Sequence, residues 1–274
     1  MTATTADSAQ SVDLAAMPLV LMYHSVSPYD EDPLEVTMTP ERFERHMCWL
    51  GSRGLRGVSV SELLSARAEG RGRGLVALTF DDGYQDFITR AIPVLQQYGC
   101  SATVFVLAGR LGGQNAWDSS GPCKALLTAD QVCQAAESGM EIASHGLDHV
   151  SLTEADDTRL RAETVHSRAV LQKLIGRQIR GFAYPWGHVD ARTVKAVQAA
   201  GYDYACAVGA SAAIGRHSIP RTPVFEHDSG WRLDAKRIHF RLTVGNRLAV
   251  RRHRGNARSS QWSTCDGDPA PPPE

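Results

Sequence analysis

The stretch Leu75-Val-Ala-Leu-Thr-Phe80, which runs directly into Asp81-Asp82-Gly83, decides the fold of this chain. A short and mostly apolar run of this kind is typical of a strand buried on both faces, as strands of parallel sheets are. Other apolar runs also end in polar or conformationally special residues. These are Leu19–Tyr23 before His24, Met140–Ser144 before His145, and Gly181–Tyr184 before Pro185-Trp186-Gly187. We therefore expect functional side chains to gather at one edge of a parallel sheet.

Strand and helix patterns alternate on both sides of this stretch. The predicted strands are 18–23, 75–80, 102–107, 140–144, 179–184 and 204–208. The predicted helices are 40–51, 88–98, 128–138, 156–175 and 189–200, with Thr39 and Thr128 as N-caps and glycines as stops. This alternation predicts an α/β fold with a parallel sheet, either open or closed into a barrel.

Length and composition favour one folded domain. The chain has 274 residues and is 43% hydrophobic, which is enough for a single substantial core. We expect the folded domain to span residues 17–249. The first 16 residues are small and polar, and residues 250–274 are rich in Arg and Pro, so both ends are expected to be disordered.

The charge balance excludes several classes of partner. The formal net charge is −1 and the pI is about 6.8, so we expect no nucleic-acid and no membrane partner. The basic residues between Arg247 and Arg258 are expected to form a solvated tail, with a nucleic-acid or lipid contact as the alternative. No secretory signal, membrane-spanning run or CxxC pair is visible. We therefore expect a cytoplasmic protein with reduced thiols, and an export route without a recognisable signal stays open.

Two motifs indicate a metal-dependent hydrolase. Asp81 and Asp82 are adjacent at a strand end, so one carboxylate can bind a metal while the other faces substrate. The alternative is a helix N-cap at a βα turn. His145 and His149 stand four residues apart, a spacing that brings both imidazoles to one face of a helical turn. The alternative is a pair of surface or core histidines. Two histidines and one carboxylate form a ligand set that leaves positions open for water and substrate.

Three segments carry a resemblance to a known family. T79-F-D-D-G83, S144-H-G-L-D-H149 and F182-A-Y-P-W-G187, in this order, resemble the polysaccharide deacetylase family, also called carbohydrate esterase family 4. The resemblance extends over about residues 17–225. It implies a distorted, incomplete (β/α) barrel of about seven parallel strands. It also implies hydrolysis of an acetamide on an amino sugar by a metal-dependent hydrolase.

The resemblance also implies the roles of individual residues. Asp82, His145 and His149 would hold a divalent metal, usually zinc, with cobalt or other ions as alternatives. Asp81 would be the general base for water activated by the metal. The backbone N–H of Trp186 would be the oxyanion donor.

The sequence departs from the family pattern at two positions. Many relatives take their general acid from a histidine on the last strand. Here the strand that ends in His24 fits this role better than His239 or His253, and it implies a circularly permuted barrel. The alternative is a histidine with a structural role. Many relatives also place an arginine just before the P-x-G turn, where this chain has Ala183 and Tyr184; Arg221 is our candidate replacement as the partner of Asp81.

The substrate class stays open at this stage. We expect an N-acetylated sugar, either an oligosaccharide or a biosynthetic intermediate. The alternatives are a small non-sugar amide, or a non-catalytic carbohydrate-binding protein on the same scaffold. Trp117, Trp231 and Tyr23 are either sugar-stacking residues or core and rim residues. Asp148 is a candidate for orienting a ligand histidine, and residues 110–125 are a candidate cleft wall. The sequence predicts no oligomeric state.

Overall fold

The computed structural model describes residues 19–208, 215–240 and 242. The elements below belong to one compact unit, Pro18–Arg237. The terminal segments that the sequence predicts to be disordered, 1–16 and 250–274, lie outside the described residues. Among the described residues, no helix has both the length and the apolar content to cross a membrane.

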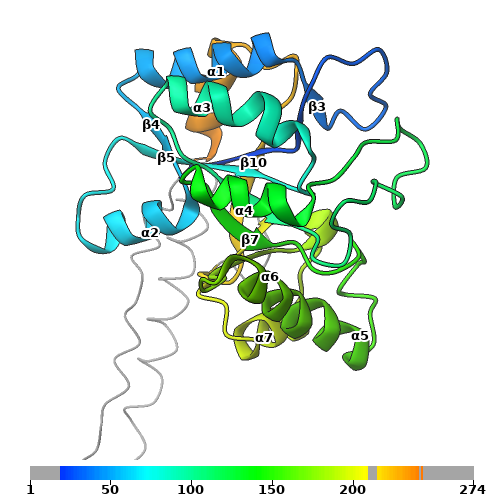
Figure 1. The fold of residues 1–274 in the computed structure, drawn as a ribbon. Coiled ribbons are helices and arrows are strands. Elements are labelled where there is room, and N and C mark those ends of the chain that lie inside the picture. Colours follow the sequence, from blue (N-terminus) through cyan, green and yellow to red (C-terminus); the bar gives the residue numbers. More distant parts are fainter. Residues whose placement is uncertain (1–18, 209–214, 241, 243–274) are drawn as a thin grey trace, which may run out of the picture. The chain divides into compact units, whose positions relative to one another are not determined.

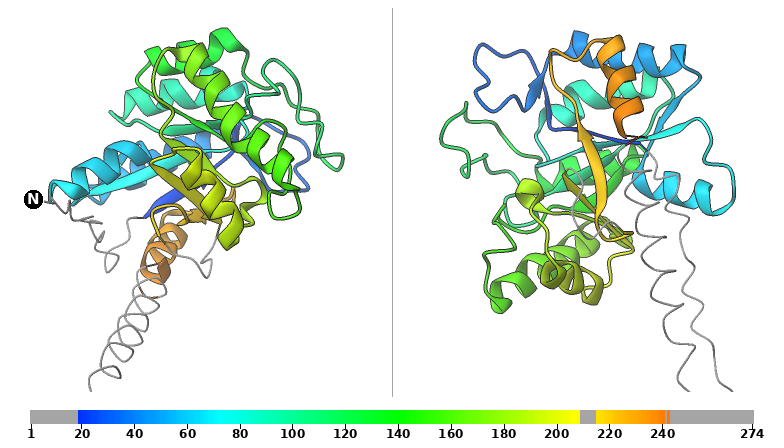
Figure 2. Two further views of the ribbon diagram at one scale, coloured as in Figure 1. Left: turned by 90° about the horizontal axis from the view of Figure 1, so that it is seen from below. Right: turned by 180° about the vertical axis from the view of Figure 1, so that it is seen from behind.

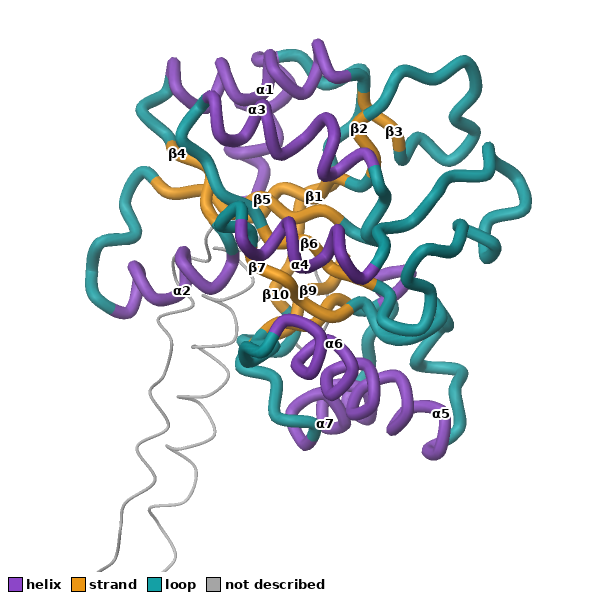
Figure 3. The backbone as a smooth tube through the Cα atoms, in the orientation of Figure 1, coloured by secondary structure: helices purple, strands orange, loops and turns teal. Residues whose placement is uncertain are grey.

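Seven parallel strands close into a barrel, in agreement with the predicted fold class. Their order around the ring follows the chain, and the first strand pairs with both the last strand and β5. The tube in Figure 3 shows these strands at the centre, with the helices outside them. The ring consists of β1 (Val20–Tyr23), β5 (Leu75–Phe80), β6 (Thr103–Val106), β7 (Glu141–Ser144), β8 (Gly181–Ala183), β9 (Tyr204–Val208) and β10 (Ile219–Pro223).

Three further strands lie beside the ring. One pairs with the first half of β5, and the other two form a separate two-stranded sheet. They are β4 (Arg56–Val58), β2 (Ser25–Val26) and β3 (Thr37–Met38). The yellow-orange β10 strand beside the blue β1 strand marks the seam of the barrel (Figure 2).

Helices connect the strands and cover the outside of the barrel (Figure 1). Their bounds are α1 (Pro40–Ser52), α2 (Val60–Ala68), α3 (Ile92–Gln97), α4 (Ala129–Glu137), α5 (Asp157–Arg161), α6 (Ser167–Ile175) and α7 (Ala191–Ala199). Thr39 caps α1 and Thr128 caps α4, as predicted, each by accepting a backbone N–H. The strand β4 and the helix α2 were not predicted. Arg56-Gly57-Val58 is too short and too polar to give a strand signal.

Two helices that the sequence predicts to be regular contain π turns. The segment η2 (Phe87–Ala91) precedes α3, and η3 (Ala162–His166) joins α5 to α6. In the first, Pro93 has no backbone N–H to give to the regular hydrogen-bond pattern. In the second, the Thr164 hydroxyl donates to the Leu160 carbonyl at 2.8 Å. Periodicity does not reveal such turns, since they insert a single residue into an otherwise helical pattern.

Side chains alternate between the two cores of the barrel. Inward positions such as Val20, Ala77 and Ile219 belong to one apolar cluster. Outward neighbours such as Leu21 and Leu78 belong to the larger cluster under the helices. This alternation has a period of two residues, as it must in strands. Arg221 is two residues after the inward-facing Ile219, so its side chain also points toward the barrel interior.

Candidate active site

Asp81 and Arg221 form a buried ion pair at the carboxyl end of the barrel. The two guanidinium nitrogens donate to the two carboxylate oxygens, Nη1 to Oδ1 at 2.5 Å and Nη2 to Oδ2 at 2.7 Å. Arg221 is 2% exposed and Asp81 is 4% exposed. Nη1 also lies 3.3 Å from the hydroxyl of Thr79, and the guanidinium lies 5.3 Å from the ring centroid of Phe105. The arginine expected from the sequence is therefore in contact with the expected base.

A second group of residues converges beside this pair. Asp82 Oδ1 lies 3.5 Å from His145 Nε2 and 3.3 Å from His149 Nε2, and all three side chains are buried. One potential ligand atom from each residue falls within 4.8 Å of the others. The structure thus brings together the three residues that the sequence analysis singled out as metal ligands.

The chemistry of this cluster fits a cation. His145 Nδ1 lies 2.9 Å from the carbonyl oxygen of Ala183, which can only accept, so Nδ1 carries the hydrogen. In a neutral imidazole, Nε2 then presents a lone pair toward the Asp82 carboxylate. Asp82 Oδ1 is buried and has no hydrogen-bond partner among the described residues. A divalent cation would satisfy the facing imidazole nitrogens and this oxygen together.

The backbone at these positions is strained. Asp82 has a φ of 69° and His149 a φ of 58°, in the left-handed region that side chains with a Cβ rarely adopt. Such conformations cost free energy, and they persist where the surrounding structure enforces them, often at functional sites. Both strained residues belong to the converging cluster, which supports a functional reading of it.

The carboxylates of the site are held in their charged forms. Burial alone raises the pKa of Asp81, but the charge of Arg221, joined by that of His145 when its imidazole is protonated, reverses this effect and lowers the pKa below its usual 3.8. Burial acts in the same direction on Asp82, and the facing imidazoles of His145 and His149 outweigh it, so its pKa lies well below the usual range. Both carboxylates are therefore ionised at neutral pH.

His24 follows β1 at the level where Asp81 follows β5. Tyr23 pairs with Phe80 in the register of these two strands, and the Tyr23 carbonyl accepts the Asp81 N–H at 3.0 Å. Burial lowers the pKa of His24, and the carboxylates of Asp81 and Asp82 partly offset that effect. His24 lines the same pocket as both carboxylates.

These residues line a pocket of about 280 Å³ whose lining is more apolar than polar. Trp117 stacks on the ring of His149 with centroids 4.7 Å apart, and Trp186 meets the same ring edge-on at 4.7 Å. Trp186 is 49% exposed and has a φ of 61°. The remaining lining residues are Met22, Leu34, Val36, Tyr84, Asp118, Gly187 and Val208. Leu34, Val36 and Tyr84 were not singled out from the sequence, because they come from loops whose path it does not reveal.

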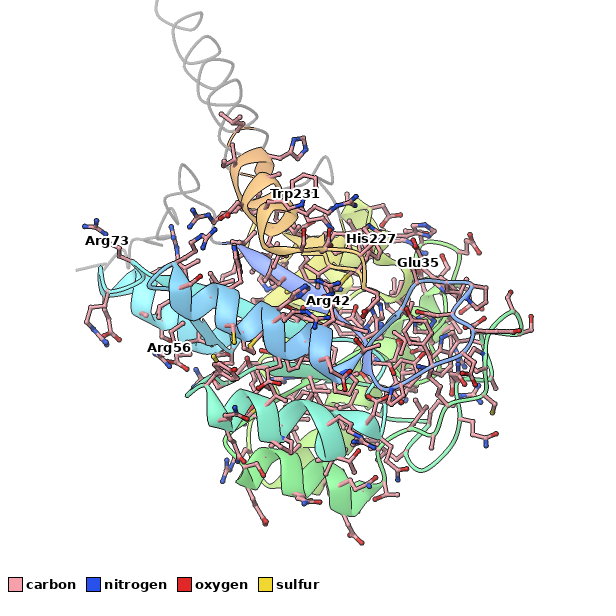
Figure 4. The ribbon with its side chains drawn as sticks, turned by 90° about the horizontal axis from the view of Figure 1, so that it is seen from above. Glu35, Arg42, Arg56, Arg73, His227 and Trp231 are labelled. Atoms are coloured by element: carbon pink, nitrogen blue, oxygen red, sulfur yellow. The ribbon has the colours of Figure 1, made fainter. Side chains whose placement is uncertain are left out.

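Two aromatic candidates from the sequence lie outside the pocket. Tyr23 is buried in the core, where it stacks on Phe80 and contacts His46 through its hydroxyl. Trp231 lies on the helical segment that begins at Gly230 and is 68% exposed (Figure 4). Of the three aromatic candidates, Trp117 is therefore the one that the structure brings to the site.

The predicted cleft wall and Asp148 take defined places. Residues 110–125 contribute Trp117 and Asp118 to the pocket, and Asn115 ties the loop together by accepting the Lys124 N–H at 2.7 Å. Asp148 pairs with Arg110 at 2.9 Å and with Arg159 at 2.6 Å. Its carboxylate is thus engaged by arginines, and His149 Nδ1 has no hydrogen-bond partner among the described residues, so Asp148 does not orient this candidate ligand.

Comparisons with known proteins identify the family. A polysaccharide deacetylase family model matches residues 68–205. YxkH of Bacillus subtilis, which bears a polysaccharide deacetylase name, is 30% identical over 185 residues, 67% of this chain and 61% of that protein. This chain therefore spans less than two thirds of that relative. The poly-β-1,6-N-acetyl-D-glucosamine N-deacetylase of Staphylococcus epidermidis is 24% identical over 210 residues, 68% of this chain and 70% of that protein.

A solved structure agrees with these sequence relatives. The Streptococcus pyogenes deacetylase PplD, in complex with acetate, has a TM-score of 0.67 and 26% identity, and the match covers 80% of this chain and 97% of that one. The closed barrel, the motifs at its carboxyl end and the match over half of the sequence agree with one another. On these grounds the chain belongs to the polysaccharide deacetylase family.

Proposed function

We propose that this protein hydrolyses the N-acetyl group of an N-acetylated amino sugar. The observation that carries the proposal is the presence in one pocket of the Arg221-bound Asp81 beside the Asp82, His145 and His149 cluster. The similarity to proteins named as N-deacetylases, and to a deacetylase that was solved with acetate, supports the same reaction. The substrate would be an oligosaccharide or a biosynthetic intermediate.

Asp82, His145 and His149 would hold a divalent cation, with zinc as the first candidate and cobalt as an alternative. Their two nitrogens and one oxygen leave further positions open, as hydrolysis requires. When bound, such a cation supplies Lewis acidity, which lowers the pKa of a water molecule and polarises an acetyl carbonyl.

Asp81 would act as the general base. Its ionised carboxylate can accept a proton from the attacking water, since each oxygen keeps a lone pair beyond the one that Arg221 occupies. Arg221 would fix the direction of these lone pairs. The bidentate geometry suits this task, because the planar guanidinium leaves the carboxylate one orientation.

His24 and Trp186 would complete the reaction. An amine anion is too basic to depart unaided, so a general acid must protonate the nitrogen. His24 would supply this proton after taking one up from solvent, since its lowered pKa makes the resting imidazole neutral at pH 7. The backbone N–H of Trp186 would donate to the tetrahedral oxyanion, and a single preorganised donor is typically worth about 3–4 kcal/mol.

The lining of the pocket favours a sugar over a small non-sugar amide. Trp117 and Trp186 both line it, and aromatic faces suit the apolar face of a sugar ring. An intact set of ionisable residues favours an enzyme over a non-catalytic sugar-binding protein. The cytoplasmic location that the sequence predicts stays a prediction, which cell fractionation would test.

The test is acetate release from N-acetylglucosamine oligomers by purified protein. We expect acetate that disappears with a chelator, returns with zinc or cobalt, and is absent in Asp81→Asn. Asp130→Asn is the matched control, since it removes an exposed carboxylate on α4. If metal-loaded protein releases no acetate from these oligomers, an oligosaccharide substrate is ruled out, and a small non-polymeric amide becomes the leading candidate.

A further inference from the structure

Glu163 is a fully buried carboxylate whose position the reaction does not explain. It lies in the π turn η3, and its side chain is 0% exposed. Oε2 accepts the backbone N–H of Leu147 at 2.5 Å and that of Asp148 at 3.3 Å. These residues lie between His145 and His149. A buried carboxylate is unfavourable unless it is well paired, so its contacts with this turn need a physical account.

The turn between the two histidines is shaped around this carboxylate. Gly146 has a φ of 88°, and a Cβ at this position would lie 2.5 Å from Glu163 Oε2. The carboxylate thus occupies the space of a side chain at position 146. Ser144 accepts the Gly146 N–H at 3.1 Å and pairs with Ser167 of α6 at 2.9 Å. Backbone N–H groups of the turn are therefore satisfied by side chains from the η3–α6 helix and from the end of β7.

Arg159 ties the outer side of the turn to the same carboxylate. Its Nη2 lies 2.8 Å from Glu163 Oε1 and 2.6 Å from Asp148 Oδ2. The guanidinium compensates the buried charge and also holds the residue that precedes His149. The turn is therefore bound to the helix both through its backbone and through a side chain.

The two ligand histidines differ in how their rings are held. His145 Nδ1 is fixed by the carbonyl of Ala183. His149 Nδ1 is buried and has no hydrogen-bond partner among the described residues. Most ligand histidines are oriented by a hydrogen bond at the second ring nitrogen. The His149 ring must therefore be oriented by the backbone of the turn and by its ring contacts with Trp117 and Trp186.

We infer that Glu163 is a positioning residue for the metal site, which holds the 145–149 turn so that both imidazoles face Asp82. The inference rests on the proposed metal site. Glu163 would thus influence metal affinity although it lies on η3, on the far side of the turn, and does not line the pocket.

The test compares the metal affinity of two variants, each of which loses one carboxylate: the buried Glu163 in one and the half-buried Glu141 in the other. Glu163→Gln replaces one of the two carboxylate oxygens with an NH2 group. The glutamine side chain then has one oxygen left, which cannot accept from both backbone N–H groups and also face Arg159. Glu141→Gln is the matched control: Glu141 begins β7, and it accepts from Ser61, Thr103 and Tyr204 at the end of the strand opposite His145. Both substitutions should lower the urea midpoint of unfolding.

Zinc affinity is measured by competition with a chromophoric chelator, in buffer where each variant is fully folded. We expect zinc to bind Glu163→Gln about 10- to 100-fold more weakly than wild type. Glu141→Gln should stay within about twofold of wild type, because its contacts do not reach the turn. The visible absorption of the cobalt-loaded protein should change in Glu163→Gln alone, since it reports the geometry of the ligands.

Two outcomes would overturn the inference. One is wild-type zinc affinity and a wild-type cobalt spectrum in Glu163→Gln, whatever its stability. The other is equal weakening in Glu141→Gln, which would mean that loss of stability explains both. A wild-type protein that binds no zinc would instead overturn the proposed metal site, and this inference with it.

Discussion

At the scale of single residues, the pair of Arg221 and Asp81 joins two requirements of the proposed reaction. A base must be ionised at neutral pH and must point in one direction, and a bidentate guanidinium provides both. The pair is buried, so its net contribution to stability is small when desolvation is counted, although removal of one partner is costly. The arginine reaches Asp81 from β10 and not from the segment before Pro185. Its place in the sequence therefore differs from the pattern described for many relatives, but an arginine still pairs with the proposed base.

Replacement of Arg221 should therefore affect both activity and stability. In Arg221→Ala, Asp81 becomes a buried carboxylate without its partner, and the free energy of unfolding should fall by about 3–5 kcal/mol. Arg221→Lys should recover part of the stability and little of the turnover, because one ammonium cannot hold both oxygens. Urea unfolding and acetate release check the two effects. Full turnover in Arg221→Lys would show that bidentate orientation is not needed.

His24 should affect turnover without affecting metal content. If it is the general acid, His24→Ala should lower turnover by about 10²–10⁴-fold. Zinc content, measured by elemental analysis, should stay that of wild type, since His24 is not a member of the ligand cluster. His166→Ala, which removes an exposed histidine on η3, is the control. Unchanged turnover in His24→Ala would make the assignment wrong.

At the scale of elements, strand alternation and helix caps follow directly from residue type. Ile219 and Arg221 share one face of β10 because strand side chains alternate, and Thr128 caps α4 because its hydroxyl accepts an orphan N–H. The π turn that carries Glu163 does not follow in this way. It places the Glu163 carboxylate against the turn after β7, and neither the extra residue nor such a contact leaves a periodic signal in a single sequence.

The cap of α7 gives an element-scale test with a defined pH dependence. Asp190 accepts the Thr193 N–H at 2.8 Å, and this hydrogen bond lowers its pKa below the usual 3.8. A carboxylate with a depressed pKa stabilises the fold above its unfolded pKa, and the contribution is lost as pH falls through the folded pKa. Asp190→Ala should therefore lower the free energy of unfolding by about 1 kcal/mol at neutral pH, and by less near pH 3.

Urea unfolding over this pH range provides the measurement. Asp190→Asn is the control, since asparagine caps helices about as well without the charge. Its cost should be a few tenths of a kcal/mol, by comparison with the small differences among good N-caps. An alanine variant whose cost does not change between neutral and acid pH would contradict the attribution to the charged cap.

At the scale of the whole molecule, closure of the barrel assembles the site. β1 lies between β10 and β5, so residues near both ends of the folded unit meet at one rim. His24 comes from the first strand, Asp81 and Asp82 from the second strand around the ring, His145 from β7 and Arg221 from the last strand. No two adjacent helices or strands contain all of these site residues.

Metal binding should consequently stabilise the whole fold. Ligands from separate strands face one another in the native state and not in the unfolded chain, so zinc at about 100 times its Kd should raise the free energy of unfolding by about 2.7 kcal/mol. Urea unfolding with zinc and with a chelator measures the difference. The increment should vanish in His149→Ala and persist in His166→Ala. Equal stability with and without zinc in the wild type would contradict the metal site.

The sequence by itself determined the α/β class, the carboxyl-end clustering of polar residues, and a group of carboxylates and histidines able to bind a metal. These features depend on local pattern: apolar runs make buried strands, and the residue after each strand lies at a common rim. The family resemblance added the closed barrel and the choice of Asp82, His145 and His149 as the candidate ligands. The tertiary structure alone decided that Arg221 reaches both oxygens of Asp81, that Trp117 packs on His149, and that Glu163 binds the turn between the histidines. Each of these contacts joins residues that are far apart in the sequence or in separate elements, and only chain packing fixes their distances.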